Sequence, residues 1–354
     1  MKYLITSTQS PGNGGAATNA YKIIKHLRKQ GHKAYGIFFL CNNEDPYSVD
    51  IDPDYIEHID YLRCYWKTGD IQEAEQYVLD VKNRIENYLD GEPDVIWAKN
   101  VLAPLSSSAL YPKVKIVYLV SGVSVLTIIN NMNQKDGHEL ISGQKFLNND
   151  YSNEIELALK NNNSLVELKT MFLSSEVLVN SQLTKECMIK IFPQYNEKIV
   201  EPVNTSLYTT NDITDFETKK FEDREYDLIF VSSSFGRLIK NPQFCKQIFD
   251  HEKTKNLKKL VIGDGDLFDD CPNTTHILRT DHKEVLKHMN NSKLLLMTSY
   301  FDSSPNTLYE AVNCGCKVLI SKNIGAYDKF PEENVCSDVY DVDEWLGKIQ
   351  SILP

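Results

Sequence analysis

Short apolar segments alternate with amphipathic segments along most of the chain. In the first half, the pattern predicts buried strands at Tyr3–Thr6, Lys33–Phe39, Val95–Ala98, Lys115–Val120, Glu176–Val179 and Lys198–Glu201. Between the first two strands, Ala20, Ile23, Ile24 and Leu27 have the i, i+3, i+4, i+7 spacing of a buried helix face. Gly31 stands where such a helix is expected to stop. This alternation is typical of βαβ units on a parallel sheet.

A second series of strands and helices follows a polar segment. Its predicted strands are Asp227–Val231, Lys259–Ile262, His276–Leu278, Lys293–Met297 and Lys317–Ser321. The polar segment, Thr205–Glu225, lacks apolar periodicity, so we interpret it as a single linker. The pattern therefore predicts an α/β protein of two Rossmann-like domains joined once, at residues 1–208 and 222–354.

One region interrupts the alternation in the first half. Asn130–Asn163 is rich in Asn, Gln, Asp and Lys and has weak periodicity. We expect it to be a mobile insertion with a short helix around Glu154–Lys160.

Charge and composition exclude some classes of protein. The 354 residues carry a formal net charge of -11, which argues against a nucleic-acid partner, because nucleic-acid phosphates require a basic surface. A small anionic ligand needs only a few local donors and stays compatible with this charge. We expect no signal peptide and no transmembrane segment, since no apolar run approaches about 18 residues. These features indicate a cytoplasmic protein, with peripheral contact to a membrane surface if the acceptor is a lipid.

The cysteines indicate neither a disulfide framework nor a metal site. There are eight, at positions 41, 64, 187, 245, 271, 314, 316 and 336, without a CxxC pair. We interpret them as reduced thiols. Cys314 and Cys316 flank a glycine at a predicted helix end, and packing explains them better than metal ligation does.

Three loops at predicted strand ends carry candidate chemistry, and the first is Ser10–Gly15. Its Gly14 and Gly15 would let the backbone approach a ligand, and the following helix start offers N–H groups to an anion. A tight turn needs glycine in any case. The segment does not match GxGxxG, and no acidic residue ends the second predicted strand, which argues against a nicotinamide oxidoreductase.

The second loop, Ser232–Asn241, follows the first strand of the second series. It brings two cations, Arg237 and Lys240, close together at a strand end. A guanidinium and an ammonium group suit a diphosphate. The alternative is a solvated basic pair on a surface helix.

The third loop, Tyr300–Pro305, follows a strand and leads into a predicted helix that stops at Gly315. The helix start can hold phosphate oxygens. Glu310, about a turn and a half into the helix, can accept hydrogen bonds from a ribose diol. The alternative is plain helix capping, with Glu310 as an ordinary surface acid.

Taken together and in order, these segments resemble the retaining GT-B glycosyltransferase family with an E-x7-E motif (glycosyl transferases group 1, family 4-like). Gly14, Gly15, Leu27, Gly31 and His32 are similar to its N-terminal GG…L…GH signature. The loop with Arg237 and Lys240 resembles its phosphate loop, and Asp302 to Glu310 has the E-x7-E spacing. The resemblance implies two Rossmann-like domains facing each other across a cleft, the first on the acceptor side and the second binding a nucleotide sugar.

The resemblance also implies roles for individual residues. Arg237 and Lys240 would neutralise the nucleotide diphosphate, Glu310 would hold the ribose hydroxyls and Asp302 would contact the transferred sugar. The other donor contacts would come from the backbone of Ser303 and Ser304, from Asn306 and Thr307 near the phosphates, and from Gly14 and Gly15.

Two positions depart from the family pattern. The first glutamate of the motif is Asp302 here, shorter by one methylene, and Ser121-Gly122 stands where many members have a histidine. On that side we expect Lys99, Asn100 and Ser121, which end predicted strands, to contact the acceptor.

The expected activity is that of a hexosyltransferase that moves sugar from a UDP- or GDP-sugar to a hydroxyl of a glycan, lipid-linked or small-molecule acceptor. The resemblance implies retention at the anomeric carbon, no metal ion and no cofactor. Two alternatives stay open: a sugar-nucleotide epimerase or hydrolase of the same fold, and a non-catalytic nucleotide-sugar-binding homologue.

Overall fold

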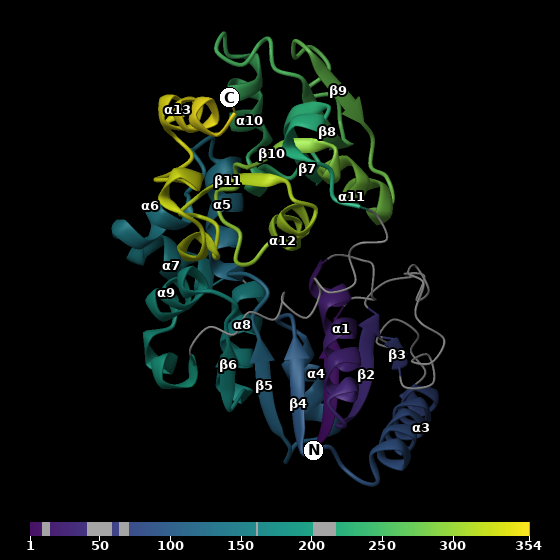
Figure 1. Cartoon of the computed structure of the whole chain (residues 1–354). Helices are drawn as coiled ribbons and strands as arrows, with labels where there is room; N and C mark the ends of the chain where they lie inside the picture. Colours follow the sequence, from purple (N-terminus) through teal and green to yellow (C-terminus); the bar gives the residue numbers. More distant parts are fainter. Residues whose placement is uncertain (9–14, 41–58, 64–70, 161, 201–216, 354) are drawn as a thin grey trace. The chain divides into compact units, whose positions relative to one another are not determined.

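The protein forms two compact units in a computed structural model that describes residues 1–8, 15–40, 59–63, 71–160, 162–200 and 217–353 (Figure 1). The first unit comprises Met1–Ile129, Ser152–Asn180 and Thr184–Thr209. The second comprises Asn130–Tyr151, Ser181–Leu183 and Thr210–Pro354.

The first unit is built on a parallel sheet with the strand order β3-β2-β1-β4-β5-β6. Its strands are β1 (Lys2–Ser7), β2 (Lys33–Leu40), β3 (Ile59–Arg63), β4 (Val95–Lys99), β5 (Lys115–Leu119) and β6 (Glu176–Leu178). The order reverses between β1 and β4. In open α/β sheets, ligands bind outside the carboxyl ends of the strands at such a reversal.

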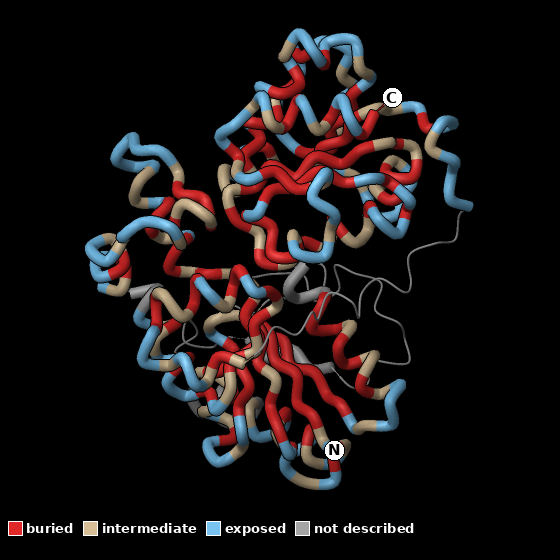
Figure 2. The backbone as a smooth tube through the Cα atoms, turned by 60° about the vertical axis from the view of Figure 1, so that its left-hand side comes forward, coloured by how far each residue is buried: buried red, intermediate tan, exposed pale blue. Residues whose placement is uncertain are grey.

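Helices cover both faces of this sheet. The predicted first helix is α1 (Gly15–Lys29), and its Ile23 and Ile24 pack with Ile5 and Val95 on one face. On the other face, α3 (Ile71–Leu89) and α4 (Ala103–Leu110) pack against apolar side chains that include Leu4 and Ile96. Strands β1, β4 and β5 are buried along most of their length (Figure 2). The apolar runs of the sequence are thus buried on both sides, as expected for a parallel sheet.

The second unit repeats this topology. Its parallel sheet has the order β12-β11-β10-β7-β8-β9 and reverses between β7 and β10. The strands are β7 (Tyr226–Ser234), β8 (Lys259–Asp264), β9 (Thr274–Ile277), β10 (Ser292–Met297), β11 (Lys317–Ser321) and β12 (Val335–Cys336).

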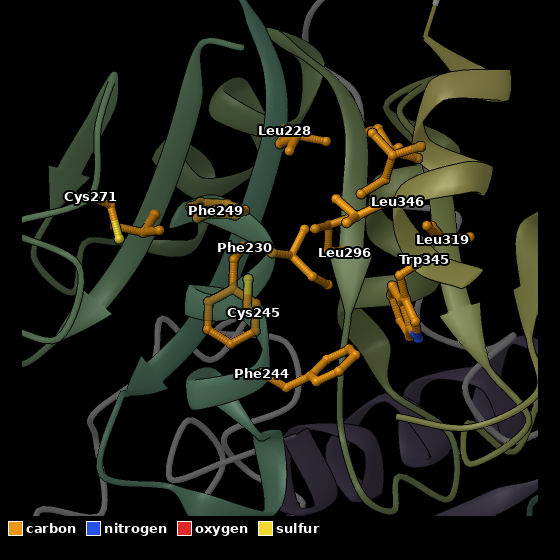
Figure 3. Close-up of a cluster of buried hydrophobic side chains, with 14 of the residues drawn as sticks. Leu228, Phe230, Phe244, Cys245, Phe249, Cys271, Leu296, Leu319, Trp345 and Leu346 are labelled. Atoms are coloured by element: carbon orange, nitrogen blue, oxygen red, sulfur yellow. The ribbon is translucent and has the colours of Figure 1, made fainter. Parts of the chain in front are cut away.

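An aromatic cluster fills the core on one side of the second sheet (Figure 3). There α10 (Pro242–Asp250) and α13 (Val342–Ile352) lie against the strands, and the rings of Phe244 and Trp345 meet edge to face with centroids 5.7 Å apart. The other side is covered by α11 (His282–Asn290) and α12 (Asn306–Asn313), through buried residues such as Leu286 and Leu308. Because α12 follows the carboxyl end of β10 along the chain, its first turn lies at the carboxyl edge of the sheet.

The predicted mobile insertion is attached to the second unit instead. Residues 130–151 contain the end of α5 (Ser124–Lys135) and α6 (Gly143–Asn148). The N–H of Gly143 donates to Tyr300 O at 2.8 Å, and the N–H of Gln144 donates to Asn323 Oδ1 at 2.8 Å. The predicted domain at 1–208 included these residues, whereas the structure groups them with the second unit. The chain therefore passes between the units more than once, so the prediction of a single linker was wrong.

The remaining helices of the first unit follow this segment. They are α7 (Ser152–Leu159), α8 (Asn162–Leu173) and most of α9 (Gln182–Ile191). The strand predicted at Lys198–Glu201 is reduced to a bridge between Ile199 and Val177. No helix of the described residues is long and apolar enough to cross a membrane.

The six cysteines that the structure describes are buried and form no disulfide with one another. Burial raises the pKa of the Cys316 thiol to about 12, so it stays protonated at neutral pH. The interpretation as reduced thiols holds for these six; Cys41 and Cys64 lie outside the described residues.

Candidate functional site

The loops that follow β7 and β10 are joined at the strand-order reversal of the second sheet. The first contains the 3-10 turn Leu238–Lys240, and the Ile239 carbonyl accepts a hydrogen bond of 2.9 Å from the Tyr300 N–H. Thr298 Oγ1 donates to Asn241 O at 3.0 Å. Asn241 adopts a left-handed conformation, with φ of 50°, and caps α10 by accepting from the Phe244 N–H. These bonds fix the backbone that carries Lys240.

Lys240 and Asp302 form an ion pair across this reversal. Lys240 Nζ donates to Asp302 Oδ2, and both side chains are mostly shielded from solvent. The Asp302 backbone is held on its other side by the loop after β11, since its N–H donates to Asn323 O and its carbonyl accepts from Gly325 N. The structure therefore brings together two of the four charged residues predicted to be catalytic, which are Arg237, Lys240, Asp302 and Glu310.

Arg237 lies on the same turn but points elsewhere. Its carbonyl accepts from the Lys240 N–H at 2.9 Å, while its guanidinium is exposed and donates to Ser233 Oγ at 3.3 Å. Within the described residues, no hydrogen bond or ion pair joins Arg237 to the loop Asp302–Thr307. The predicted contact of Arg237 with the nucleotide diphosphate stays a prediction.

The start of α12 has no side-chain cap. Its N-cap is Pro305, with φ of -71° and ψ of 126°, and proline has no side-chain acceptor. The plain capping alternative therefore does not explain this turn. The first N–H groups of a helix have no partner within the helix, so those of Asn306 and Thr307 can bind an anion. Ser303 is buried and Ser304 is half-buried just before the turn.

A glycine that the sequence analysis missed lies against this loop. A Cβ on Gly325 would come within 1.9 Å of Ser303 O and 2.3 Å of Ser181 Oγ. Only glycine therefore lets the two loops pack together. The segment Asn323–Gly325 gave no local signal of this contact.

Glu310 is paired with a histidine. Its Oε1 lies 3.0 Å from His282 Nε2, and its side chain is only 15% exposed against 60% for His282. Glu310 is thus not an ordinary surface acid. His282 is the first residue of α11, after the N-cap Asp281, and the sequence analysis did not identify it.

Two of the predicted acceptor residues meet at the carboxyl edge of the first sheet. Ser121 Oγ donates to Asn100 Oδ1 at 3.0 Å, and Asn100 Nδ2 donates to Thr8 Oγ1 at 3.3 Å. Asn100 has φ of 72°, the left-handed conformation that asparagine tolerates better than most residues. A cavity of about 400 Å³ lies here, and its lining includes all three residues.

A buried carboxyl group lies behind this cavity. Tyr118, one of the lining residues, donates its hydroxyl to Glu167 Oε1 at 3.5 Å. Glu167 also accepts hydrogen bonds from Ser124 and Val125 at the start of α5. Burial raises the pKa of Glu167 to about 7, and these bonds oppose the rise. The sequence analysis missed Glu167, because nothing near α8 indicates burial of this one acid.

The third predicted acceptor residue, Lys99, lies outside the cavity that Asn100 and Ser121 line. It ends β4, is 3% exposed and does not line the cavity. Burial lowers the pKa of Lys99 to about 8.

Gly15 begins α1, and Gly14 lies outside the described residues. Where the structure describes side chains, no group of three or more His, Cys, Asp or Glu could hold a metal ion.

Comparisons with known proteins identify the fold. No protein-family model and no curated protein sequence matches the chain. Sucrose-phosphate synthase from Thermosynechococcus elongatus is similar in structure, with a TM-score of 0.63 and 14% identity over 99% of this chain and 90% of that one. A UDP-forming α,α-trehalose-phosphate synthase from Burkholderia xenovorans has a TM-score of 0.59 and 12% identity, over 99% and 91%.

WaaG, a glycosyltransferase involved in lipopolysaccharide biosynthesis, has a TM-score of 0.57 and 13% identity, over 99% and 90% of the two chains. These neighbours have the GT-B fold. The chain therefore has the GT-B fold, with two Rossmann-like domains, as its sequence predicted.

Proposed function

We propose that the protein is a hexosyltransferase that moves a sugar from a nucleotide-sugar donor, such as a UDP- or GDP-sugar, to an acceptor hydroxyl. The observation that carries the proposal is the meeting of Lys240 and Asp302 at the strand-order reversal of the second sheet, beside an uncapped helix start. A cation, a carboxylate and free N–H groups at this edge match a diphosphate that carries a sugar.

The similar structures support this choice of substrate. One is UDP-forming, and another, a starch synthase from Arabidopsis thaliana, is described as bound to ADP and acarbose. Their fold is shared with this chain, and the proposal extends their donor class to it.

Each residue has a physical task in the proposed reaction. The leaving nucleoside diphosphate gains negative charge as the glycosidic bond breaks, and Lys240 with the N–H groups of Asn306 and Thr307 stabilises that charge where it develops. Arg237 adds a second cation when its guanidinium exchanges the hydrogen bond of 3.3 Å to the Ser233 hydroxyl for a phosphate oxygen.

The sugar and the ribose are held on either side of the diphosphate. Asp302 and the backbone of Ser303 and Ser304 accept and donate hydrogen bonds to the sugar, and Glu310 accepts from the ribose hydroxyls. Transfer proceeds with retention and without a metal ion, the departing phosphate oxygen taking the acceptor proton. The acceptor binds in the first unit, near Asn100 and Ser121.

A thermal-shift screen of UDP-, GDP-, ADP- and CDP-sugars tests donor binding, because a ligand of the folded state raises its stability. We expect the sugars of one of these four nucleotides to raise the melting temperature of the wild-type protein. The variant Lys240→Met should abolish that rise. Lys258→Met, at an exposed lysine before β8, is the control and should leave it unchanged. The proposal fails if no nucleotide sugar stabilises the wild-type protein.

Turnover then separates the alternatives. Sugar found on an added acceptor supports transfer, and NMR of the new anomeric centre tests retention. Isomerised or hydrolysed donor without dependence on acceptor would indicate an epimerase or hydrolase. Donor binding without turnover on any acceptor would indicate a non-catalytic binding protein. Activity that survives EDTA supports a metal-independent reaction.

A further inference from the structure

Two polar residues lie side by side at the strand-order reversal of the first sheet, and neither belongs to the cavity near Asn100. Ser7 is the last residue of β1, Lys99 is the last residue of β4, and the two are paired in the parallel register of these strands. Both are buried, Lys99 at 3% exposure and Ser7 at 0%.

Their side chains share the face of the sheet that α1 covers. Side chains alternate along a strand, and Thr6 lies on the opposite face, where its hydroxyl is 2.9 Å from Ser107 of α4. Ile5 and Trp97, two residues before Ser7 and Lys99, pack in the cluster around α1. The ammonium and the hydroxyl therefore lie on one face, at the edge where α/β sheets bind ligands.

Neither group is satisfied by the rest of the described chain. Ser7 Oγ has no hydrogen-bond partner. Nothing but burial acts on the pKa of Lys99, so no described carboxylate stabilises its charge. Burial without a partner is unfavourable for an ammonium group, and buried lysines are normally paired. An arrangement this unfavourable, at the carboxyl edge of the sheet, indicates a binding role.

We propose that Lys99 and Ser7 bind an oxyanion group, phosphate or carboxylate, that the acceptor carries. An oxyanion supplies the charge that Lys99 lacks and an acceptor for the Ser7 hydroxyl. The inference rests on the proposed function in one respect, the placing of the acceptor in the first unit.

The cavity of this unit is lined by the residues that come next along the chain. Thr8 and Asn100, which line it, directly follow Ser7 and Lys99. The proposal places the acceptor sugar in the cavity and its anionic substituent at the ends of β1 and β4. This selects acceptors such as sugar phosphates or uronic acids over neutral sugars.

Titration calorimetry on the full chain, at constant ionic strength, tests the inference with inorganic phosphate, acetate, glucose 6-phosphate, glucuronate and glucose. We expect glucose 6-phosphate or glucuronate to bind more tightly than the free anion, and glucose to bind far more weakly. Lys99→Met should weaken the anionic sugar about 30-fold or more, as loss of a buried charge partner does. Ser7→Ala should weaken the binding of the anionic sugar about fivefold. This variant should still fold, because the Ser7 hydroxyl makes no hydrogen bond whose loss could destabilise the chain.

Two matched variants serve as controls. Lys115→Met changes an exposed lysine at the other end of the same sheet, and Lys240→Met changes the lysine proposed to bind the donor. Both should keep the binding of the anionic sugar. Binding that is unchanged in both Lys99→Met and Ser7→Ala, or wild-type protein that binds none of the anions, would overturn the inference.

The same samples keep this inference apart from the proposed function. If donor stabilisation depends on Lys240 but oxyanion binding is the same in Lys99→Met as in wild type, the inference about Lys99 is wrong and the proposed function stands. If Lys99 binds the anionic sugars no more tightly than the free anions, the site is specific for free anions. That result would also overturn the assignment of the site to the acceptor.

Discussion

His282 Nε2 lies 3.0 Å from Glu310 Oε1, so the first residue of α11 holds the carboxylate of α12. The carboxylate is 15% exposed and has one oxygen in this bond. A pair of this kind orients the carboxylate before any ligand arrives, which reduces the ordering that binding requires.

Glu310→Gln should weaken donor binding about 10- to 100-fold, because it removes a charged acceptor from the proposed ribose contact. Donor titration by calorimetry measures this. His282→Ala should weaken binding less, since it removes orientation but keeps the carboxylate. Equal donor affinity in wild type and Glu310→Gln would place Glu310 outside the binding site.

The ion pair between Lys240 and Asp302 should behave as a coupled unit. Lys240→Met should lower kcat about 10²–10³-fold, the usual effect of removing one donor that stabilises developing charge. Asp302→Asn should also lower activity, through the sugar contact. Because the two side chains are in contact, the double variant should lose less than the product of the single effects. Strictly multiplicative losses in a double-mutant cycle would show that the pair has no functional coupling.

Glu167 should make the stability of the protein fall as the pH rises. Burial raises its pKa to about 7 in the folded chain from the ordinary value of 4.5, so the folded state holds this proton more tightly than the unfolded state does. Its stabilising contribution is complete below pH 4.5 and is lost as the pH rises through about 7. The loss amounts to about 3 kcal/mol at most.

Glu167→Gln removes this dependence. The free energy of unfolding of the wild type minus that of the variant should therefore decrease between pH 4.5 and pH 7.5, as measured by urea unfolding. Glu92→Gln, at an exposed glutamate of the same unit, is the control and should show no comparable decrease. A difference that stays constant over this range would contradict the assignment.

Lys99 should have the opposite effect on stability, which it should raise as the pH rises. Burial lowers its pKa to about 8 from 10.5, so the folded state binds this proton less tightly than the unfolded state, and the burial cost is present in full below pH 8. Lys99→Met should therefore raise the free energy of unfolding by about 1–3 kcal/mol at pH 7 without added oxyanion. The gain should shrink as the pH rises from 8 to 10.5. A variant less stable than wild type at pH 7 would show that the lysine has a structural partner.

Local patterns account for much of the fold. The apolar runs of most strands and the helix face at Ile23, Ile24 and Leu27 are signals carried by neighbouring residues, and the structure contains those elements. The strands that were missed carry little signal. In β3, charged residues, Asp60 and Arg63, interrupt the apolar pattern, and β12 has two residues, so pairing with a neighbour defines both.

The sequence by itself determined most of the strands along the chain, the loops at their carboxyl ends and the seven residues between Asp302 and Glu310, because these are local properties. Only the tertiary structure decided that Lys240 meets Asp302, that His282 meets Glu310 and that Ser7 lies beside Lys99. Those residues are 62, 28 and 92 positions apart. Strand register and loop packing bring them together, and these arise from hydrogen bonds and burial between distant segments, which no local periodicity encodes.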